Sequence, residues 1–411
     1  MKIKQLFFML FGIMVLSSCS KSENSDDSYS SKTLVIARSE ESHNHIESFI
    51  EEFASESTYN IIEKRYPSTD LLTMAIIGGE QIDIIYADKN IDVSPLAGKG
   101  ILTNLTQYIN EDDYVMSVLN AMKHNGKLYE IPYDFDVESA ASKKKLWNHD
   151  TDTSFEHILD KSNELGCKIP FDYTVDSYGF ITFLMSKYMD FENKTCSFDS
   201  EDFISLIEFM KKYYRSVEGM TNEQLYESFK NDDMLMIATG FSSFDQLDYL
   251  EYDVGDEIEF IGFPSEEENF HIAVPRSTFS VADSSQNKNE AIEFVTKCIS
   301  FDSYVITLPD GSKMISHNYS LPINSEALDF CYSQSLARNN FNIPDEIRKG
   351  NADELMHQIN TISYAARTSD LKIQEIIKDE LSAYFAGNKD SESVCHNIQS
   401  RCMLFFDEQY N

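Results

Sequence analysis

The chain is short of basic residues, of glycine and proline, and of tryptophan, which occurs once. Lys and Arg number 34 against 69 Asp and Glu, so the formal net charge is −35 over 411 residues. Because nucleic-acid binding depends on Lys and Arg that neutralise phosphates, direct binding to nucleic acid is excluded. The 15 Gly and 9 Pro fall below the average for globular chains, which favours long regular elements. With 42% hydrophobic residues, the chain can build the cores of two or three domains.

Common catalytic and redox motifs are also missing. The sequence has no Gly-x-Ser-x-Gly, no phosphate-binding P-loop, no His-Glu-x-x-His and no Cys-x-x-Cys, which argues against the commonest enzymes. Cys395 and Cys402 lie seven apart on an expected helix, about 10.5 Å along its axis, too far for a disulfide. His43 and His45 could share a metal only on an extended segment. We expect buried thiols and predict no catalytic residue, no cofactor and no bound metal. The cysteines beyond the N-terminal region are Cys167, Cys196, Cys298, Cys331, Cys395 and Cys402.

The longest apolar run stands at the N-terminus, from Leu6 to Leu16, behind Lys2 and Lys4. As a helix it would span about 16 Å, roughly half of a bilayer core, so it is too short for a transmembrane helix. A charged start, a short apolar centre and small residues behind it are typical of a secretory signal, here residues 1–18.

The residues that follow this run resemble a bacterial lipobox, in the sequence Leu16-Ser17-Ser18-Cys19. The resemblance implies that Cys19 becomes the mature N-terminus and carries lipid, as in palmitate-bearing lipoproteins. Several acyl chains would anchor the chain firmly, whereas a single chain binds a membrane only marginally. The Ser- and Asp-rich stretch 19–32 then serves as a flexible, lipid-anchored tether.

Strands and helices alternate in the next part of the chain. Thr33 to Ala37 is a continuous apolar run, typical of a parallel strand covered on both faces. Apolar residues at helical spacing follow at 46–53, a second strand is expected at 60–66, a helix at 71–77 and a third strand at 82–86. This order predicts a parallel α/β sheet.

The middle and the end of the chain are richer in helix. Amphipathic periods predict helices at 155–165, 177–189, 201–214 and 289–300, the third capped by Ser200, and apolar runs predict strands at 234–238 and 259–263. Two helices close the chain, the first ended by Gly387 and the second opening at Ser391.

Five segments, in this order, resemble the bacterial extracellular solute-binding proteins of family 1, the lipid-anchored receptors of ABC importers. They are Ile77-Gly78-Gly79-Glu80-Gln81-Ile82-Asp83-Ile84-Ile85, Gly126-Lys127-Leu128-Tyr129-Glu130-Ile131-Pro132-Tyr133, Ile261-Gly262-Phe263-Pro264, the stretch 287–300, and Ala383-Tyr384-Phe385-Ala386-Gly387 with the last helix to Glu408. The resemblance covers essentially the whole mature chain. Glu130 stands where the family usually has Gly.

The resemblance implies a two-lobed, periplasmic-binding-protein-like (type II) α/β fold. Each lobe would be a mostly parallel sheet flanked by helices, with a ligand cleft between the lobes. The expected N-terminal lobe comprises residues 33–137 and 272–322, and the expected C-terminal lobe residues 138–271 and 323–411.

Candidate ligand-binding residues follow from that placement, because ligands of doubly wound sheets sit beyond the carboxyl ends of the strands. The segments there mix aromatic rings, which pack on the apolar faces of sugars, with carboxylates and Arg, which form charge-assisted hydrogen bonds. Trp147 is either a residue of the ligand cleft or a residue that packs within a lobe. The candidates are Glu40, Glu41, Ser42, Tyr86, Asp88, Tyr133, Asp134, Asp136, Tyr173, Tyr178, Phe241, Phe244, Asp245, Tyr364 and Arg367.

By this resemblance the protein is not an enzyme but an extracytoplasmic receptor. It would capture a small solute, a sugar or oligosaccharide, by hinge closure and deliver it to the transmembrane subunits of an ABC permease. We expect a monomer on the outer face of the bacterial cell membrane, attached to the membrane only through the lipid on Cys19. The alternatives are a receptor for a metal, polyamine or peptide, and a surface enzyme that acts on glycans.

Overall fold

The structure is a computed structural model that describes residues 33–40, 46–56, 59–88, 93–172, 178–191, 193–217, 219–264, 270–316, 320–366 and 371–410. The expected signal peptide, Cys19 and the tether lie outside these residues.

The first elements alternate as expected: β1 (Thr33–Ser39), α1 (Ile46–Glu56), β2 (Asn60–Tyr66), α2 (Thr69–Ile77), β3 (Ile84–Asp88) and α3 (Val93–Gly98). β1 pairs in parallel with both β2 and β3, which confirms the predicted parallel unit. β3 begins two residues later than expected, because Asp83 forms a bend. Its buried carboxylate accepts a hydrogen bond from the Val35 backbone N–H at 2.8 Å.

Long strands and helices make up the remainder. The elements before residue 230 are the 3-10 helix Glu111–Asp113, α4 (Met116–Met122), β4 (Ile131–Lys143), α5 (Lys144–Trp147), α6 (Phe155–Leu165), β5 (Ile169–Phe171), α7 (Tyr178–Tyr188), β6 (Met189–Asp190), β7 (Thr195–Cys196), α8 (Glu201–Val217) and α9 (Asn222–Lys230). Those after it are β8 (Met234–Phe241), α10 (Gln246–Val254), β9 (Ile258–Phe260), β10 (Ile272–Val281), α11 (Lys288–Cys298), α12 (Phe301–Tyr304), β11 (Val305–Thr307), β12 (Lys313–Ile315), β13 (Leu321–Pro322), α13 (Ser325–Ala337), α14 (Asp345–Asn360), β14 (Tyr364–Ala365), α15 (Leu371–Phe385) and α16 (Ser391–Tyr410).

The predicted helices from residue 155 onwards are confirmed, and several elements were not predicted. α6 has the expected bounds, and the Ser200 hydroxyl accepts from the Phe203 backbone N–H at 3.2 Å, as expected of a cap. The sequence did not predict the long strands β4 and β10 or the helices α13 and α14.

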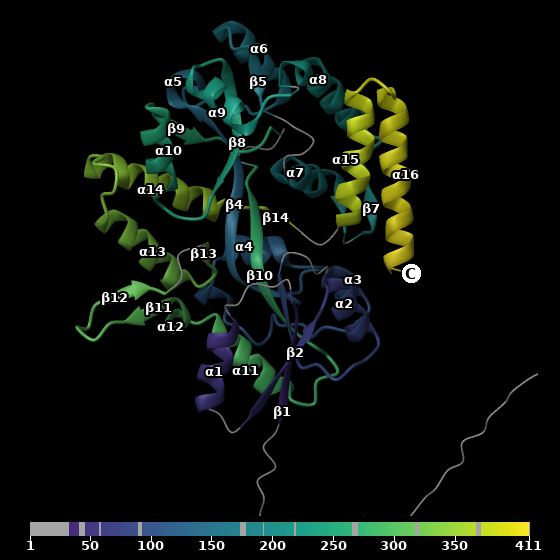
Figure 1. The fold of residues 1–411 in the computed structure, drawn as a ribbon, viewed down its shortest axis with the longest axis vertical. Coiled ribbons are helices and arrows are strands. Elements are labelled where there is room, and N and C mark those ends of the chain that lie inside the picture. Colours follow the sequence, from purple (N-terminus) through teal and green to yellow (C-terminus); the bar gives the residue numbers. More distant parts are fainter. Residues whose placement is uncertain are drawn as a thin grey trace, which may run out of the picture.

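One large sheet runs through the whole molecule (Figure 1). Its main strand order is β2-β1-β3-β10-β4-β8-β5, with β13 and β9 on β4 and β14 on β10. β4 and β10 pair with each other in antiparallel and pass from the lobe around β1–β3 into the lobe around β5 and β8. The sheet is therefore mixed: the expected parallel pairing holds for β2-β1-β3 and for β5-β8, and the two crossing strands add antiparallel pairs.

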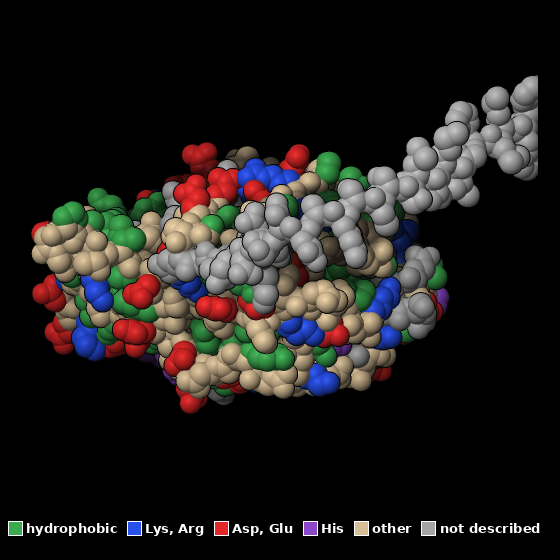
Figure 2. Space-filling view, turned by 90° about the horizontal axis from the view of Figure 1, so that it is seen from below, with side chains coloured by type: hydrophobic (Ala, Val, Ile, Leu, Met, Phe, Trp, Pro, Cys, Tyr) green, Lys and Arg blue, Asp and Glu red, His purple; other side chains and the backbone are tan. Residues whose placement is uncertain are grey.

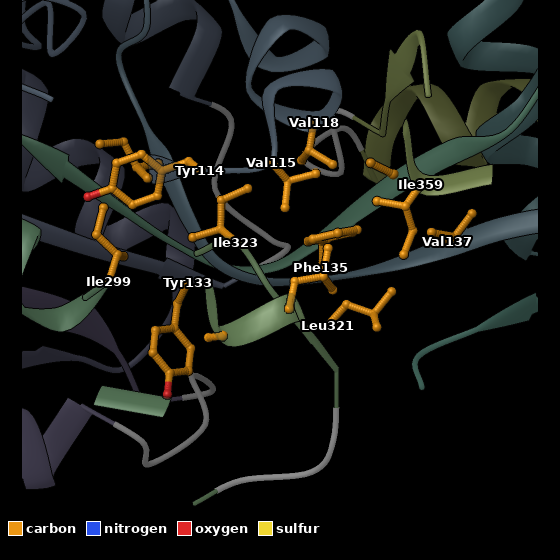
Figure 3. Packing of buried hydrophobic residues seen from close by; sticks show 14 of the residues in the cluster. Tyr114, Val115, Val118, Tyr133, Phe135, Val137, Ile299, Leu321, Ile323 and Ile359 are labelled. Atoms are coloured by element: carbon orange, nitrogen blue, oxygen red, sulfur yellow. The ribbon is translucent and has the colours of Figure 1, made fainter. Parts of the chain in front are cut away.

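The apolar core on one face of this sheet is continuous between the lobes. It joins Leu34 and Ile36 of β1 with Phe229 and Met234 of the other lobe. β4 provides the connection, because Tyr133, Phe135 and Val137 pack with residues of α4, α14 and β13 (Figure 3).

On the opposite face there are two separate cores. One, between β1, β3, α2 and α3, contains Leu72 and Ile85. The other, between β4, β10, α7, α8, α15 and α16, contains Trp147, which is fully buried and thus a packing residue. The lobes therefore share a core on one face of the sheet and keep their own cores on the other.

None of the six cysteines in the described residues forms a disulfide, as expected from their spacing. Three of them, Cys298, Cys395 and Cys402, are buried. In the part of the chain that the structure covers, none of the helices combines the length and the apolar character needed to cross a bilayer.

Candidate functional site

The candidate site lies where β4 and β10 cross between the two separate cores. Side chains alternate along a strand, so Asp136 and Glu138 face away from the continuous core that holds Phe135 and Val137. Arg276 of β10 stands beside them. Polar and charged side chains thus occupy the stretch of sheet between the two separate apolar cores.

An ion pair fixes the centre of this stretch. The Arg276 guanidinium contacts Oδ2 of Asp136 through both Nε and Nη2, and Asp136 is only 6% exposed. The pairing of β4 and β10 shifts register between Pro275 and Ser277, next to Arg276. Such irregularities change the direction of a side chain, so that it no longer follows the regular alternation between the two faces of the sheet. The shift accounts for the contact of Arg276 with Asp136, a carboxylate 140 positions earlier in the chain.

Two further carboxylates lie close to this pair. Asp134 Oδ1 accepts a hydrogen bond from the Ser277 hydroxyl at 2.9 Å. Burial raises the pKa of Asp134 to about 6, and the nearby charge of Asp136 adds to the rise. Burial also raises the pKa of Glu138, against the opposing effect of Arg276. The sequence predicted Asp134 and Asp136 but missed Glu138 and Arg276.

A close approach of two backbones borders the site. Gly240 of β8 pairs with Glu138, and a Cβ at Gly240 would lie 2.3 Å from the carbonyl oxygen of Val137. Only glycine allows this spacing. Residues 242–245, which follow β8, line a cavity together with Tyr133 and Asp134 of β4.

Asp172 is another carboxylate that the sequence analysis missed. It follows β5 directly and accepts a hydrogen bond from the Ala238 backbone N–H at 2.8 Å. Burial raises its pKa to about 7. The signal was present in the sequence, because Asp172 leaves the end of a buried strand just before the predicted Tyr173.

Four of the predicted residues line one cavity of about 170 Å³ at the β13 edge of the sheet. They come from both lobes: Tyr133 and Asp134 from β4, Phe244 and Asp245 from the segment after β8. Gln334 and Arg338, at the end of α13, line the same cavity. The Tyr133 ring stacks on Tyr304 with centroids 4.6 Å apart.

A second cavity, of about 310 Å³, lies between α7, β14 and α15. Of the predicted residues that the structure describes, Tyr364 alone lines it, half-buried beside Phe270 with ring centroids 4.2 Å apart. Thr182 and Ser186 of α7 and Gln374 of α15 provide its polar groups.

The structure places the other predicted residues as follows. Tyr86 and Phe241 belong to the continuous core, 1% and 2% exposed, and Glu40 is exposed in a turn after β1. Glu41, Ser42, Tyr173 and Arg367 lie outside the described residues, as do the side chains of Asp88 and Tyr178. Within the described residues, no cluster of three or more His, Cys, Asp or Glu could hold a metal ion.

Comparison with known proteins gives one family and many similar structures. A family model described as bacterial extracellular solute-binding protein matches residues 50–307. No curated protein sequence matches the chain.

The similar solved structures cover almost the entire chain at low sequence identity. The sugar-binding protein MalE from Xanthomonas citri is 12% identical, with 92% of this chain and 98% of that chain covered and a TM-score of 0.59. The cyclic alpha-maltosyl-1,6-maltose binding protein from Arthrobacter globiformis is 12% identical, with 92% and 100% covered and a TM-score of 0.57. An ABC substrate-binding protein from Listeria monocytogenes, solved in complex with cycloalternan, is 14% identical, with 92% and 99% covered and a TM-score of 0.54. At these identities the likeness shows the fold, a two-lobed binding-protein architecture.

Proposed function

Because the chain belongs to the family of bacterial extracellular solute-binding proteins, we propose that it is the receptor of an ABC importer for a sugar or oligosaccharide. The observation that carries the proposal is the polar crossing between the two separate cores, with Asp136 buried and paired to Arg276. Carboxylates and a guanidinium form charge-assisted hydrogen bonds with hydroxyl groups. Solved proteins of the same fold include a sugar-binding protein and one in complex with cycloalternan, which supports a carbohydrate cargo.

The mechanism is closure of the two lobes about the crossing segments. The expected lobe boundaries, 137/138, 271/272 and 322/323, fall within β4, at the start of β10 and at the end of β13. In this proposal the shared core on one face holds the lobes together, while the polar face opens and closes. A solute favours closure only to the extent that it binds the closed form better. Moving the closed fraction from 1% to 99% requires a preference of about 5.5 kcal/mol.

A ligand screen by thermal unfolding tests the cargo. A ligand present at a hundred times its dissociation constant stabilises the folded chain by about 2.7 kcal/mol, which raises Tm by several degrees. We expect a sugar or oligosaccharide to raise Tm, and amino acids and metal salts to leave it unchanged. If a metal raises Tm and no sugar does, the carbohydrate cargo is wrong.

Small-angle scattering tests closure separately. Saturation with the stabilising solute should reduce the radius of gyration of the full chain, because the two lobes approach each other. An unchanged radius at saturation would contradict the closure mechanism while leaving the receptor role in place. Incubation with the same solute should yield no product, which distinguishes the receptor from a glycan-active surface enzyme.

To deliver its solute, the receptor has to lie outside the cytoplasm and next to its permease. The family is extracellular, and we propose that the lipid on Cys19 holds the monomer at the membrane through residues 19–32, near the transmembrane subunits. Acidic side chains spread over the face seen in Figure 2, among basic and apolar ones, suit a solvated exterior. A Cys19→Ala variant should move from the membrane fraction to the soluble fraction. Its retention in the membrane fraction would contradict the anchor.

A further inference from the structure

The carboxylates of Asp134, Asp136 and Glu138 all lie near the guanidinium of Arg276, at the crossing of β4 and β10. Asp136 is paired with Arg276, whose side chain is 38% exposed. In the part of the chain that the structure describes, no ion pair joins Asp134 or Glu138 to a basic residue. Among the residues that the structure describes, the candidate site therefore has an excess of acidic over basic side chains.

A second, independent observation concerns the hydrogen bonds of the Asp136 carboxylate. Arg276 contacts only Oδ2 of its carboxylate, and Oδ1 is buried without a hydrogen-bond partner among the described residues. Since buried acceptors in folded proteins are nearly always satisfied, we expect a donor at this oxygen that the described residues do not supply, either a water molecule or a bound solute. The carboxylate of Glu138 lies on the same face of β4, two residues on.

We propose that the solute carries a protonated amino group, which donates a hydrogen bond to Asp136 Oδ1 and lies between Asp136 and Glu138. This inference rests on the proposed function, because it assigns the chemistry of the solute in the same site. An ammonium group offers up to three donors and a positive charge, whereas a hydroxyl offers one donor and no charge. Hydrogen bonds between charged partners are about twice as strong as those between neutral groups. An acidic solute would add to the excess of acidic side chains and bind poorly.

The ammonium group could come from an amino sugar or from a polyamine, and calorimetric titration distinguishes the two. The probes are glucose, glucosamine and glucuronate, the β-1,4-linked trimers of glucose and of glucosamine, and spermidine as an amine without a sugar ring. We expect the amino member of a matched set to bind at least tenfold more tightly than the neutral member, which corresponds to about 1.4 kcal/mol.

The outcomes separate this inference from the proposed function. If the neutral or acidic member binds as tightly as the amino member, the ammonium subsite is wrong and the sugar receptor stands. If spermidine binds and no sugar does, the ammonium subsite stands and the carbohydrate cargo is wrong.

A charge-neutralising variant tests the subsite itself. Glu138→Gln keeps the size of the side chain, and the described structure shows no hydrogen bond that the exchange would break. We expect the variant to lose the tenfold preference for the amino member, because its affinity for the amino member falls more than its affinity for the neutral member. The matched control is Glu354→Gln, a carboxylate of α14 that accepts from the Phe260 backbone N–H and whose pKa burial also raises. The control should keep the preference. An unchanged preference in Glu138→Gln, with an unchanged unfolding midpoint, would overturn the subsite.

Discussion

Gly240 and Val137 approach so closely that a single methyl group at Gly240 would lie 2.3 Å from the Val137 carbonyl oxygen. The contact joins β8 to β4 beside Glu138, the strand position with which Gly240 pairs. The space between these strands is thus defined by backbone atoms, which cannot rotate away as a side chain could.

We expect Gly240→Ala to destabilise the chain by about 1–3 kcal/mol, because the added methyl group forces two backbones apart. Chemical denaturation measures the loss. Gly350 provides the matched control, since a Cβ there meets nothing within 4 Å and the residue lies inside α14. Gly350→Ala should be neutral or stabilising by up to about 1 kcal/mol. Equal stability of the two variants would show that β8 can move away from β4 at little cost.

A core truncation at the crossing should affect both lobes together. Phe135 is fully buried in the core that the lobes share (Figure 3), so Phe135→Ala should cost about 3–5 kcal/mol. Because this core is continuous, we expect one cooperative transition in urea, shifted to a lower midpoint. Leu404→Ala, at a side chain that is 57% exposed, should change stability by less than about 0.5 kcal/mol. Two separate transitions in the wild-type chain would contradict the shared core.

Acid should destabilise the protein through His271. The imidazole is fully buried at the start of β10, its Nδ1 lies 2.9 Å from the Ser139 hydroxyl, and burial lowers its pKa to about 3. The unfolded chain, with a pKa of about 6.5, binds more protons in the interval between the two values. Stability from the neutral imidazole is therefore present above about pH 6.5 and is lost as the pH falls towards 3, by up to about 1.4 kcal/mol per pH unit.

Unfolding midpoints between pH 6.5 and pH 4 measure this effect. Asp134 and Asp172, with pKa values raised to about 6 and about 7, act in the opposite direction, because there the folded chain binds more protons than the unfolded chain. The comparison is therefore between wild type and His271→Gln, whose stability should fall less steeply with acid. The exposed His396 gives the control, since His396→Gln should keep the wild-type slope. Equal slopes for His271→Gln and wild type would assign the acid loss to other groups.

The six cysteines in the described residues should all react with a thiol reagent once the chain is unfolded without reductant. Mass spectrometry of the alkylated peptides should find a modification at each of the six residues, and the native unfolding midpoint should not depend on reductant. In the folded chain Cys298, Cys395 and Cys402 should react slowly, because they are buried. A cross-linked peptide pair would show a disulfide that the structure does not contain.

Sequence patterns predicted the elements that contain a clear apolar run, such as Leu34 to Ala37 in β1. They did not predict β4, because its outward positions carry Asp134, Asp136 and Glu138 within a strand. They did not predict α14 either, whose buried face includes Arg348, Asn351 and Gln358. Some of their polar atoms bond to partners distant in the sequence, as in the bond from Asn351 Nδ2 to Asp248 Oδ1 at 2.9 Å, and local periodicity does not reveal such partners.

The residues of the candidate site also fall into two groups, those that local sequence predicts and those that depend on strand pairing. Asp136 was predicted because it follows a recognisable local segment, whereas Arg276 meets it only through strand pairing that shifts register between Pro275 and Ser277. Tyr86 was predicted from its place near the end of a strand, but the alternation of side chains directs it into the core against Phe279, with ring centroids 5.1 Å apart. A shift of one residue in strand register turns each side chain to the opposite face of the sheet. An apolar run does not specify this register.

The core shared by the lobes also constrains when the chain can fold during its synthesis. It contains Leu34 of the first strand together with Leu355, Ile359 and Ile362, which lie more than 300 positions later. An emerging chain that lacks the segment 350–362 leaves Val118 and Phe135 of this core partly uncovered. Contacts this distant in sequence form slowly. The final packing of this core therefore becomes possible only after nearly all of the chain has been made.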